Sequence, residues 1–416
     1  MYKQIRVNSE ALRRFSGLCA ISFVILLGAV SAVEAAEWRF EPELRLGADI
    51  DDNPYLSIRT DVAESETGYV AEGSAEVAYR SEKTDFDITP TLRTREYGSN
   101  SDLNSDDQFL VMNFGHETVL TNFRIRGSYD RESVRTAERA DADLEVEDPD
   151  DILDDDSGLV GTVGTRGRRE RVRVTPSFRY RATTNSSVNL QVLHTDVRFD
   201  DDIGMFLTDY TDTRVNLSYR RAWSPRFTAV VTGTYRDYQT EQGSNEINGT
   251  GLAVGIDREL SETSRLRVTF GYEDTEVEGS GDNVEPVANV SYVRRQKTTT
   301  LLAQYRRSIS ASGAGALGVR DSLSLNFTRG LSDRISAGIG ARAYTTDAID
   351  ETAGPLDERE YVQLRAQFTW HLSSTFSLQT DYRYTFLDRE AQGESANSNQ
   401  VTVWLNYRPT PMIRSR

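Results

Sequence analysis

Apolar and polar residues alternate along most of the chain after residue 37. In residues 171–180, for example, Val172, Val174 and Phe178 alternate with arginine, threonine and serine residues. Strict alternation places successive side chains on opposite faces of a β-strand, and no window sustains the i, i+3, i+4, i+7 spacing of a helix. The pattern therefore predicts an all-β protein. The clearest alternating segments are residues 38–50, 86–93, 171–180, 362–370 and 401–408.

Two kinds of connection join the alternating segments: short turns, and longer loops rich in Asp, Asn, Gly and Ser. Eight short turns and nine long loops would connect 18 strands and would place both chain termini on the side of the short turns. The short turns are expected at residues 80–85, 115–122, 181–187, 220–226, 257–264, 293–299, 328–334 and 369–375. The long loops are expected near residues 51–66, 96–107, 131–169, 196–212, 237–249, 274–286, 307–321, 345–360 and 387–399.

The polar face of these strands is rich in arginine and glutamate, which cannot pack into a dry core. Such a face can line a water-filled lumen while the apolar face contacts lipid, and closing the sheet satisfies every strand edge. We therefore expect an all-β, transmembrane, antiparallel up-and-down β-barrel of about 18 strands, with 16 as the alternative count. A soluble all-β protein is the competing interpretation. Tyrosines near strand ends, such as Tyr180 and Tyr219, would form the aromatic girdles of a barrel, unless they reflect only the general preference of tyrosine for strands.

Composition alone suggests a different class of protein. The chain has 416 residues, a net charge of −17 and only 38% hydrophobic residues, which would suit a soluble acidic protein. The alternation removes this conflict, because a barrel wall needs only one apolar face per strand. No apolar run of 18 residues follows residue 36, which excludes a transmembrane helix there, and the acidity argues against nucleic acid as a partner.

The first 35 residues are predicted to be a secretory signal peptide. Four basic residues precede an apolar stretch at residues 18–30, and Val33 and Ala35 are small residues at a cleavage site. The single cysteine, Cys19, lies within the apolar stretch. We therefore expect export of the chain and a barrel over residues 36–416, located in the outer membrane of a Gram-negative bacterium.

Arginines on the polar face of the strands would point into the lumen. Arginine is always charged and its planar guanidinium group binds carboxylates, so an arginine-lined pore would favour anions, including acidic saccharides. The alternative is a ladder of cross-strand Arg–carboxylate pairs that stiffens the wall, and both can hold at once. The candidate pore-lining residues are Arg45, Arg93, Arg95, Arg124, Arg126, Arg173, Arg179, Arg267, Arg365, Arg383, Glu72, Glu76 and Asp381.

The longest loop, residues 131–169, is strongly acidic: residues 141–156 contain ten Asp or Glu in sixteen. Clustered carboxylates could bind a divalent cation, but the spacing fits no EF-hand, and a solvated acidic loop is the simpler interpretation. Otherwise we expect no cofactor. Expected partners are outer-membrane lipid and lipopolysaccharide, whose phosphates could bind the arginines that follow this loop, and a polysaccharide or small anionic solute.

Signals for an enzyme are poor, and we expect none. The three histidines are His116, His194 and His371, and two of them fall at predicted short turns. A Ser-His-Asp grouping around His194, with Asp196 two residues on, would need a serine from a neighbouring strand. The sequence also contains no phosphate-binding loop and no Cys/His metal spacing.

Three features resemble the outer-membrane β-barrel porins associated with exopolysaccharide and exosortase gene clusters of Gram-negative bacteria. They are the segment GADIDDNPYL (residues 47–56), repeated Tyr-Arg pairs such as Tyr79-Arg80, and the final strand VTVWLNY (residues 401–407). Asn53, within the first of these, is interpreted as part of a loop entry. The resemblance implies an outer-membrane location and a role in polysaccharide export. One departure is the tail RPTPMIRSR after Tyr407, because barrel insertion signals usually end on an aromatic residue.

Three functions are therefore considered. The first is a porin-like channel that passes hydrophilic solutes or polysaccharide, with a role in exopolysaccharide export. The second is a structural barrel that anchors surface polymer through its acidic loops. The third and least favoured is an outer-membrane hydrolase that uses His194.

Overall fold

The computed structural model describes most of the predicted barrel. The described residues are 36–57, 65–98, 100–135, 137, 167–200, 207–240, 246–277, 281–313, 315–349, 359–389 and 394–415. The predicted signal peptide and the acidic stretch at residues 141–156 lie outside them. The part of the chain that is described contains no helix long and apolar enough to cross a membrane.

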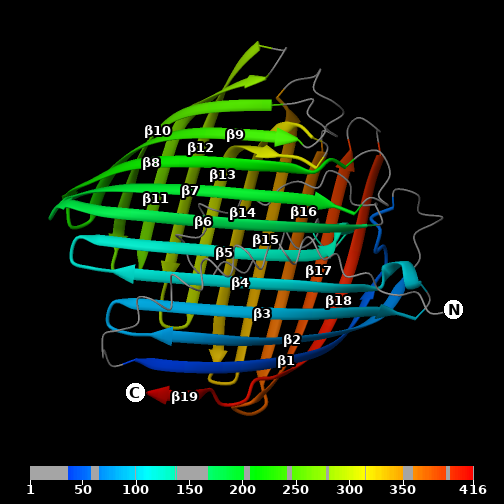
Figure 1. The fold of residues 1–416 in the computed structure, drawn as a ribbon. Coiled ribbons are helices and arrows are strands. Elements are labelled where there is room, and N and C mark those ends of the chain that lie inside the picture. The colour runs from blue at the N-terminus through cyan, green and yellow to red at the C-terminus, as the bar shows by residue number, and fades with distance from the viewer. Residues whose placement is uncertain are drawn as a thin grey trace, which may run out of the picture.

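Eighteen antiparallel strands form a closed β-barrel (Figure 1). Each strand pairs with the next in sequence, and β18 pairs with β1 to complete the ring, which confirms the predicted fold and strand count. The strands are β1 (Glu37–Asp51), β2 (Glu66–Arg80), β3 (Thr84–Tyr97), β4 (Ser105–Glu117), β5 (Thr121–Ser133), β6 (Arg168–Thr183), β7 (Ser186–Phe199), β8 (Tyr210–Ser224), β9 (Phe227–Thr240), β10 (Glu246–Ser261), β11 (Ser264–Val277), β12 (Gly281–Arg295), β13 (Thr299–Ala311), β14 (Leu317–Ser332), β15 (Ile335–Ala348), β16 (Arg359–His371), β17 (Phe376–Arg389) and β18 (Glu394–Tyr407). One 3₁₀-helix, η1 (Ser101–Leu103), precedes β4.

The short turns lie where the sequence predicts them, and both β1 and β18 have their terminal ends on the side of these turns. The connections on the opposite side are less uniform than predicted. β11 and β12 are separated by only residues 278–280, and β17 and β18 by residues 390–393. Polar residues continue the strand pairing beyond the apolar part of the wall, so several predicted long loops are the ends of long strand hairpins.

The outer face of the barrel carries an apolar belt bordered by aromatic residues. Exposed leucines and valines such as Leu217, Leu252 and Val403 occupy its middle. Near the long-connection side, tyrosine hydroxyls donate hydrogen bonds to polar residues of the next strand. The pairs are Tyr235 to Asn248 at 3.0 Å, Tyr305 to Asp321 at 2.6 Å and Tyr382 to Asn399 at 2.8 Å. Rings with a polar tip at this level match the headgroup border of a membrane.

The hairpin formed by the ends of β13 and β14 leaves the wall and folds into the barrel. β12 pairs with β13 only as far as Arg307, whereas β13 and β14 remain paired to Ala311 and Leu317. Beyond Arg307, Ile309 and Leu317 lie on the outward face of the hairpin by strand alternation, yet both are buried against Tyr210 and Tyr238 of the inner wall. The hairpin therefore forms a second layer inside β8 and β9.

A short nineteenth strand follows the predicted last strand. β19 (Met412–Ser415) pairs with Glu37–Phe40 of β1, on the same edge as β18. Phe40 pairs with Met412, and Leu44 pairs with Tyr407. The two pairs are four residues apart on β1 but five residues apart on the C-terminal segment, so this segment contains one extra residue, which forms a bulge. The tail after Tyr407 thus continues the closure of the barrel.

Candidate functional site

The inner wall of the barrel carries ladders of arginines and carboxylates. Glu72 of β2 accepts hydrogen bonds from Arg45 of β1 at 3.2 Å and from Arg93 of β3 at 2.6 Å. The Arg45 guanidinium also lies over the ring of Trp404 at 4.4 Å, across the junction of β1 and β18. These three predicted residues are therefore brought together as one cross-strand cluster.

Two further ladders include predicted residues: one on β16–β18, next to this cluster across the β1–β18 junction, and one on β8, β10 and β11. Asp381 accepts from Arg365 at 2.9 Å, and Arg383 donates to Gln400 at 3.4 Å. Arg267 lies 3.4 Å from Asp257, whose carboxylate also binds Arg220 at 2.9 Å and Arg265 at 2.5 Å.

Some of the remaining predicted residues form side-chain hydrogen bonds with other described residues, and some do not. Arg95 donates to Asp107 at 3.2 Å and Arg126 donates to Asn113 at 3.1 Å. Arg173 lies opposite Ser128 on the inner face. By contrast, the structure shows no side-chain hydrogen bond or ion pair between the described residues for Arg124, Arg179 or Glu76, although all three occupy inward positions.

Several residues that form ion pairs on the inner wall are not among those predicted from the sequence. Asp107, Asp130 and Asp212 lie near strand ends that were predicted to be loops, yet each binds an arginine of the inner wall. Arg236 is a further inward arginine that is not among the candidate pore-lining residues. Extending the strand alternation into the acidic connections would have found them, because they keep the inward parity.

Charge is distributed unevenly around the lumen. The described inner face of β5–β9 has ten arginines and three carboxylates, whereas that of β1 and β2 has three arginines and eight carboxylates. The arginines on β5–β9 are Arg124, Arg126, Arg169, Arg171, Arg173, Arg179, Arg181, Arg214, Arg220 and Arg236, and the carboxylates are Asp130, Glu132 and Asp212. The barrel therefore has a basic sector and an acidic sector, separated by β3 and β4.

The β13–β14 hairpin is bound to the basic sector by hydrogen bonds from arginines to one of its backbone carbonyl oxygens. Arg236 is fully buried and donates to both oxygens of Asp212, at 2.9 and 2.8 Å, and to the carbonyl of Ile309 at 3.1 Å. Arg214 donates to the same carbonyl at 3.2 Å. At the hairpin tip, Gly315 has a φ of 80°, which suits glycine. These contacts hold the hairpin inside the barrel, where it narrows the cross-section of the lumen.

A second inward segment follows β1. Asn53 donates to the carbonyls of Ser57 at 3.0 Å and Asn397 at 2.9 Å, so it does more than the loop-entry role expected of it. Leu56, with a φ of 47°, is buried among Tyr344, Tyr361 and neighbouring residues. The burial of its side chain compensates for the unfavourable backbone conformation.

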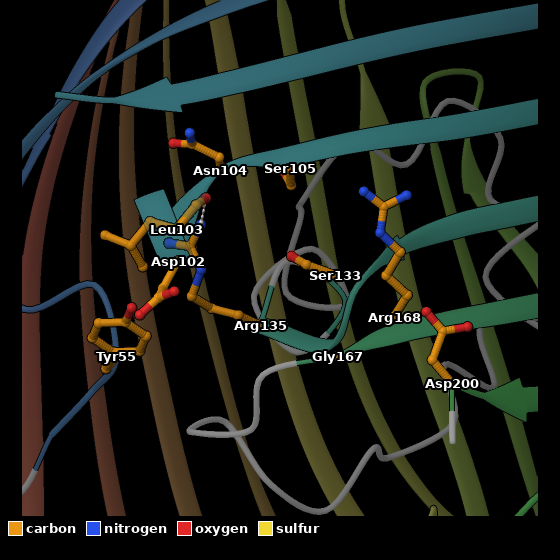
Figure 2. A pocket seen from close by; sticks show the side chains of 10 residues that line it. All are labelled: Tyr55, Asp102, Leu103, Asn104, Ser105, Ser133, Arg135, Gly167, Arg168 and Asp200. Carbon is orange, nitrogen blue, oxygen red and sulfur yellow. Dashed lines mark hydrogen bonds between the residues drawn. The ribbon is translucent and has the colours of Figure 1, made fainter. Parts of the chain in front are cut away.

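A cavity of about 450 Å³ lies among the ends of the strands that flank the long connections (Figure 2). Tyr55, Asp102 and Leu103 lie on one side of the view, and Arg168 and Asp200 on the other. Arg135 donates to the carbonyl of Leu103 at 3.1 Å. The cavity therefore combines charges of both signs with one aromatic ring.

The arrangement around His194 does not assemble a hydrolase site within the described residues. Its ring nitrogen Nδ1 lies 2.9 Å from Oγ1 of Thr213, and Asp196 is bound to Arg198 at 3.1 Å rather than to the imidazole. No group of three or more potential metal ligands occurs among the described residues. The acidic stretch considered for divalent cations lies outside them.

The closed antiparallel ring, the outward apolar belt and the charged interior together define a transmembrane β-barrel of the outer membrane of Gram-negative bacteria. No family model matches the chain, and no curated protein matches it.

Solved structures with similar architecture include Acinetobacter baumannii OccAB4, with a TM-score of 0.45, 11% identity and coverage of 91% of this chain and 98% of that one. Pseudomonas aeruginosa OpdQ has a TM-score of 0.45 and 8% identity, covering 90% and 99%. The Pseudomonas aeruginosa outer membrane protein OpdK has a TM-score of 0.44 and 8% identity, covering 90% and 99%. The barrel assignment rests on the strand pairing itself, since these likenesses are remote.

Proposed function

We propose that this protein is a porin-like channel that lets small hydrophilic solutes, preferentially anions, cross the outer membrane. The observation that carries the proposal is the basic sector on the inner face of β5–β9, where arginines greatly outnumber carboxylates. An 18-stranded barrel is wide enough to enclose an aqueous path. Fixed positive charge on its wall raises the local concentration of anions.

The test is the ion selectivity of the purified barrel in planar lipid bilayers. In a KCl gradient, the reversal potential should indicate a higher permeability for chloride than for potassium. Because screening at 1 M salt shortens the reach of charges to about 3 Å, the preference should weaken as the salt concentration rises. Absence of conductance, or a preference for potassium at low salt, would contradict the proposal.

The role in exopolysaccharide export is a finer part of the proposal and rests on the sequence resemblance. Deletion of the gene should then reduce the amount of polymer outside the cell while polymer accumulates inside. If the protein anchors polymer instead, secretion should continue and the polymer should be found free in the medium. Complementation with the intact chain serves as the control for either outcome.

A further inference from the structure

One polar patch of the inner wall, on β5 and β6, has side chains that form no hydrogen bonds or ion pairs with other described residues. On β5 and β6, Arg124 lies opposite Ser177 and Arg179 lies opposite Asn122. The four side chains form a two-by-two arrangement on the lumen face, with the guanidinium groups on one diagonal. Both arginines are exposed, and none of the four side chains has a hydrogen bond or ion pair with the described residues.

Carboxylates of the described inner face approach this patch on its β3–β4 side, where the Asp85 side chain lies over Gly115, the residue opposite Arg124. On the described inner faces of β5 and β6, the carboxylates are Asp130 and Glu132, and these are bound to Arg171 and Arg169. On β4, Glu117 occupies the inward position opposite Asn122, but it forms no ion pair with either arginine of the patch. On the other side of the patch, Arg181 of β6 and Arg220 of β8 both lie opposite Ser187 of β7. The patch therefore has acidic neighbours on β3 and β4 and basic neighbours on β6 and β8, and neither Asp85 nor Glu117 forms an ion pair with Arg124 or Arg179.

The same wall shows how its arginines bind an oxyanion. The carboxylate of Asp257 is bound by three guanidinium groups, from Arg220, Arg265 and Arg267, at 2.9, 2.5 and 3.4 Å. Inward residues on the diagonal of two neighbouring strands are roughly 7–8 Å apart, which long arginine side chains can span to reach a single group. Charge-assisted hydrogen bonds from guanidinium groups to phosphate or carboxylate are strong ones.

We propose that Arg124 and Arg179, with Ser177 and Asn122, form a binding site for a doubly charged oxyanion group, either inorganic phosphate or the phosphate group of an ester. This site rests on the proposed channel function and gives it a substrate class. Two guanidinium groups match a dianion in charge, and the hydroxyl and amide groups add further hydrogen-bond donors. A monovalent carboxylate would leave one positive charge uncompensated.

The test measures binding without requiring conduction. Folded barrel in detergent is titrated with inorganic phosphate, and separately with glycerol 3-phosphate and acetate, and line broadening of the solute resonances gives the affinities. Both phosphate compounds should bind more tightly than acetate if the group itself is recognised. Tighter binding of inorganic phosphate than of the ester would identify the free ion as the ligand, and the reverse order would identify the ester.

The double variant Arg124→Gln/Arg179→Gln should weaken phosphate binding by about tenfold. The matched control, Arg39→Gln/Arg80→Gln, removes two inward arginines from the acidic sector and should bind phosphate as the unaltered protein does. Glu117→Gln should strengthen binding. Heat-modifiable mobility on gels checks that each variant is folded.

Equal losses in the double variant and its control, or no phosphate binding by the unaltered protein, would overturn this site. Conductance without phosphate binding would contradict the site and leave the channel intact. Phosphate binding without conductance would contradict the channel alone.

Discussion

Single carboxylates of the inner wall hold several arginines in place. Asp212 is the clearest case, because it binds the fully buried Arg236 through both oxygens and also contacts Arg214. A buried guanidinium that loses its partner is strongly destabilising. An ion pair on the outer surface, such as Asp196 with Arg198, is solvated and contributes little.

The substitution Asp212→Asn should therefore lower the free energy of unfolding by about 3–5 kcal/mol, since it leaves Arg236 buried without a counter-charge. The control, Asp196→Asn on the outer face, should cost no more than about 1 kcal/mol. Urea titration of the barrel in detergent, followed by mobility on gels, measures both. Similar midpoints for the two variants would show that Asp212 has no special structural role.

At the scale of elements, strand alternation predicts the barrel well but misplaces the ends of some strands. Ile309 and Leu317 have the parity of lipid-facing residues, yet they are buried inside because their hairpin leaves the wall. Alternation distinguishes two faces of a strand, but it carries no information about where a strand departs from its neighbour. For the same reason, the pattern predicted the inward direction of Arg124 and Arg179 but could not show that they lack partners.

The C-terminal strand β19 offers a test at the same scale. Arg408, in the bulge before β19, donates to Glu43 at 2.5 Å, and this hydrogen bond raises the pKa of the Arg408 guanidinium. Deleting residues 409–416 removes the pairing with Glu37–Phe40 and should lower the free energy of unfolding by about 1–3 kcal/mol, because the start of β1 loses its backbone partners.

The control for the deletion keeps the strand and changes only its side chains. Met412→Thr/Ile413→Thr replaces two exposed apolar residues but retains the backbone pairing. Its unfolding midpoint in urea should match that of the unaltered protein. Equal losses in the control and the deletion would assign the effect to apolar contacts rather than to strand pairing.

For the whole molecule, the outer face fixes the position of the membrane. Leu217 of β8 lies opposite Gly233 in the apolar belt. The next outward-facing pair toward the long connections is Val215 with Tyr235, and Thr211 lies still closer to those connections, past the level of the Tyr235 ring. The strands therefore extend past the membrane on the side of the longer connections. A charge costs most at the middle of the bilayer and little beyond its border.

Leu217→Arg should consequently make folding into lipid less favourable by about 2–4 kcal/mol, and Thr211→Arg on the same strand by no more than about 1 kcal/mol. Folding into lipid vesicles at graded urea concentrations measures the difference. A greater cost at Thr211 than at Leu217 would mean that the membrane border lies elsewhere on the strands.

The pairing of β1 with β18 and β19 also has a consequence for the order of assembly. Leu44 pairs with Tyr407 and Phe40 with Met412, so closing the ring joins residues that lie far apart in the sequence. Closing so long a loop is entropically costly and slow. Until the final residues have been delivered, β1 presents an open edge that can bind other strands. A chain released early would therefore be prone to aggregate, and its handover to the membrane has to wait for the C-terminus.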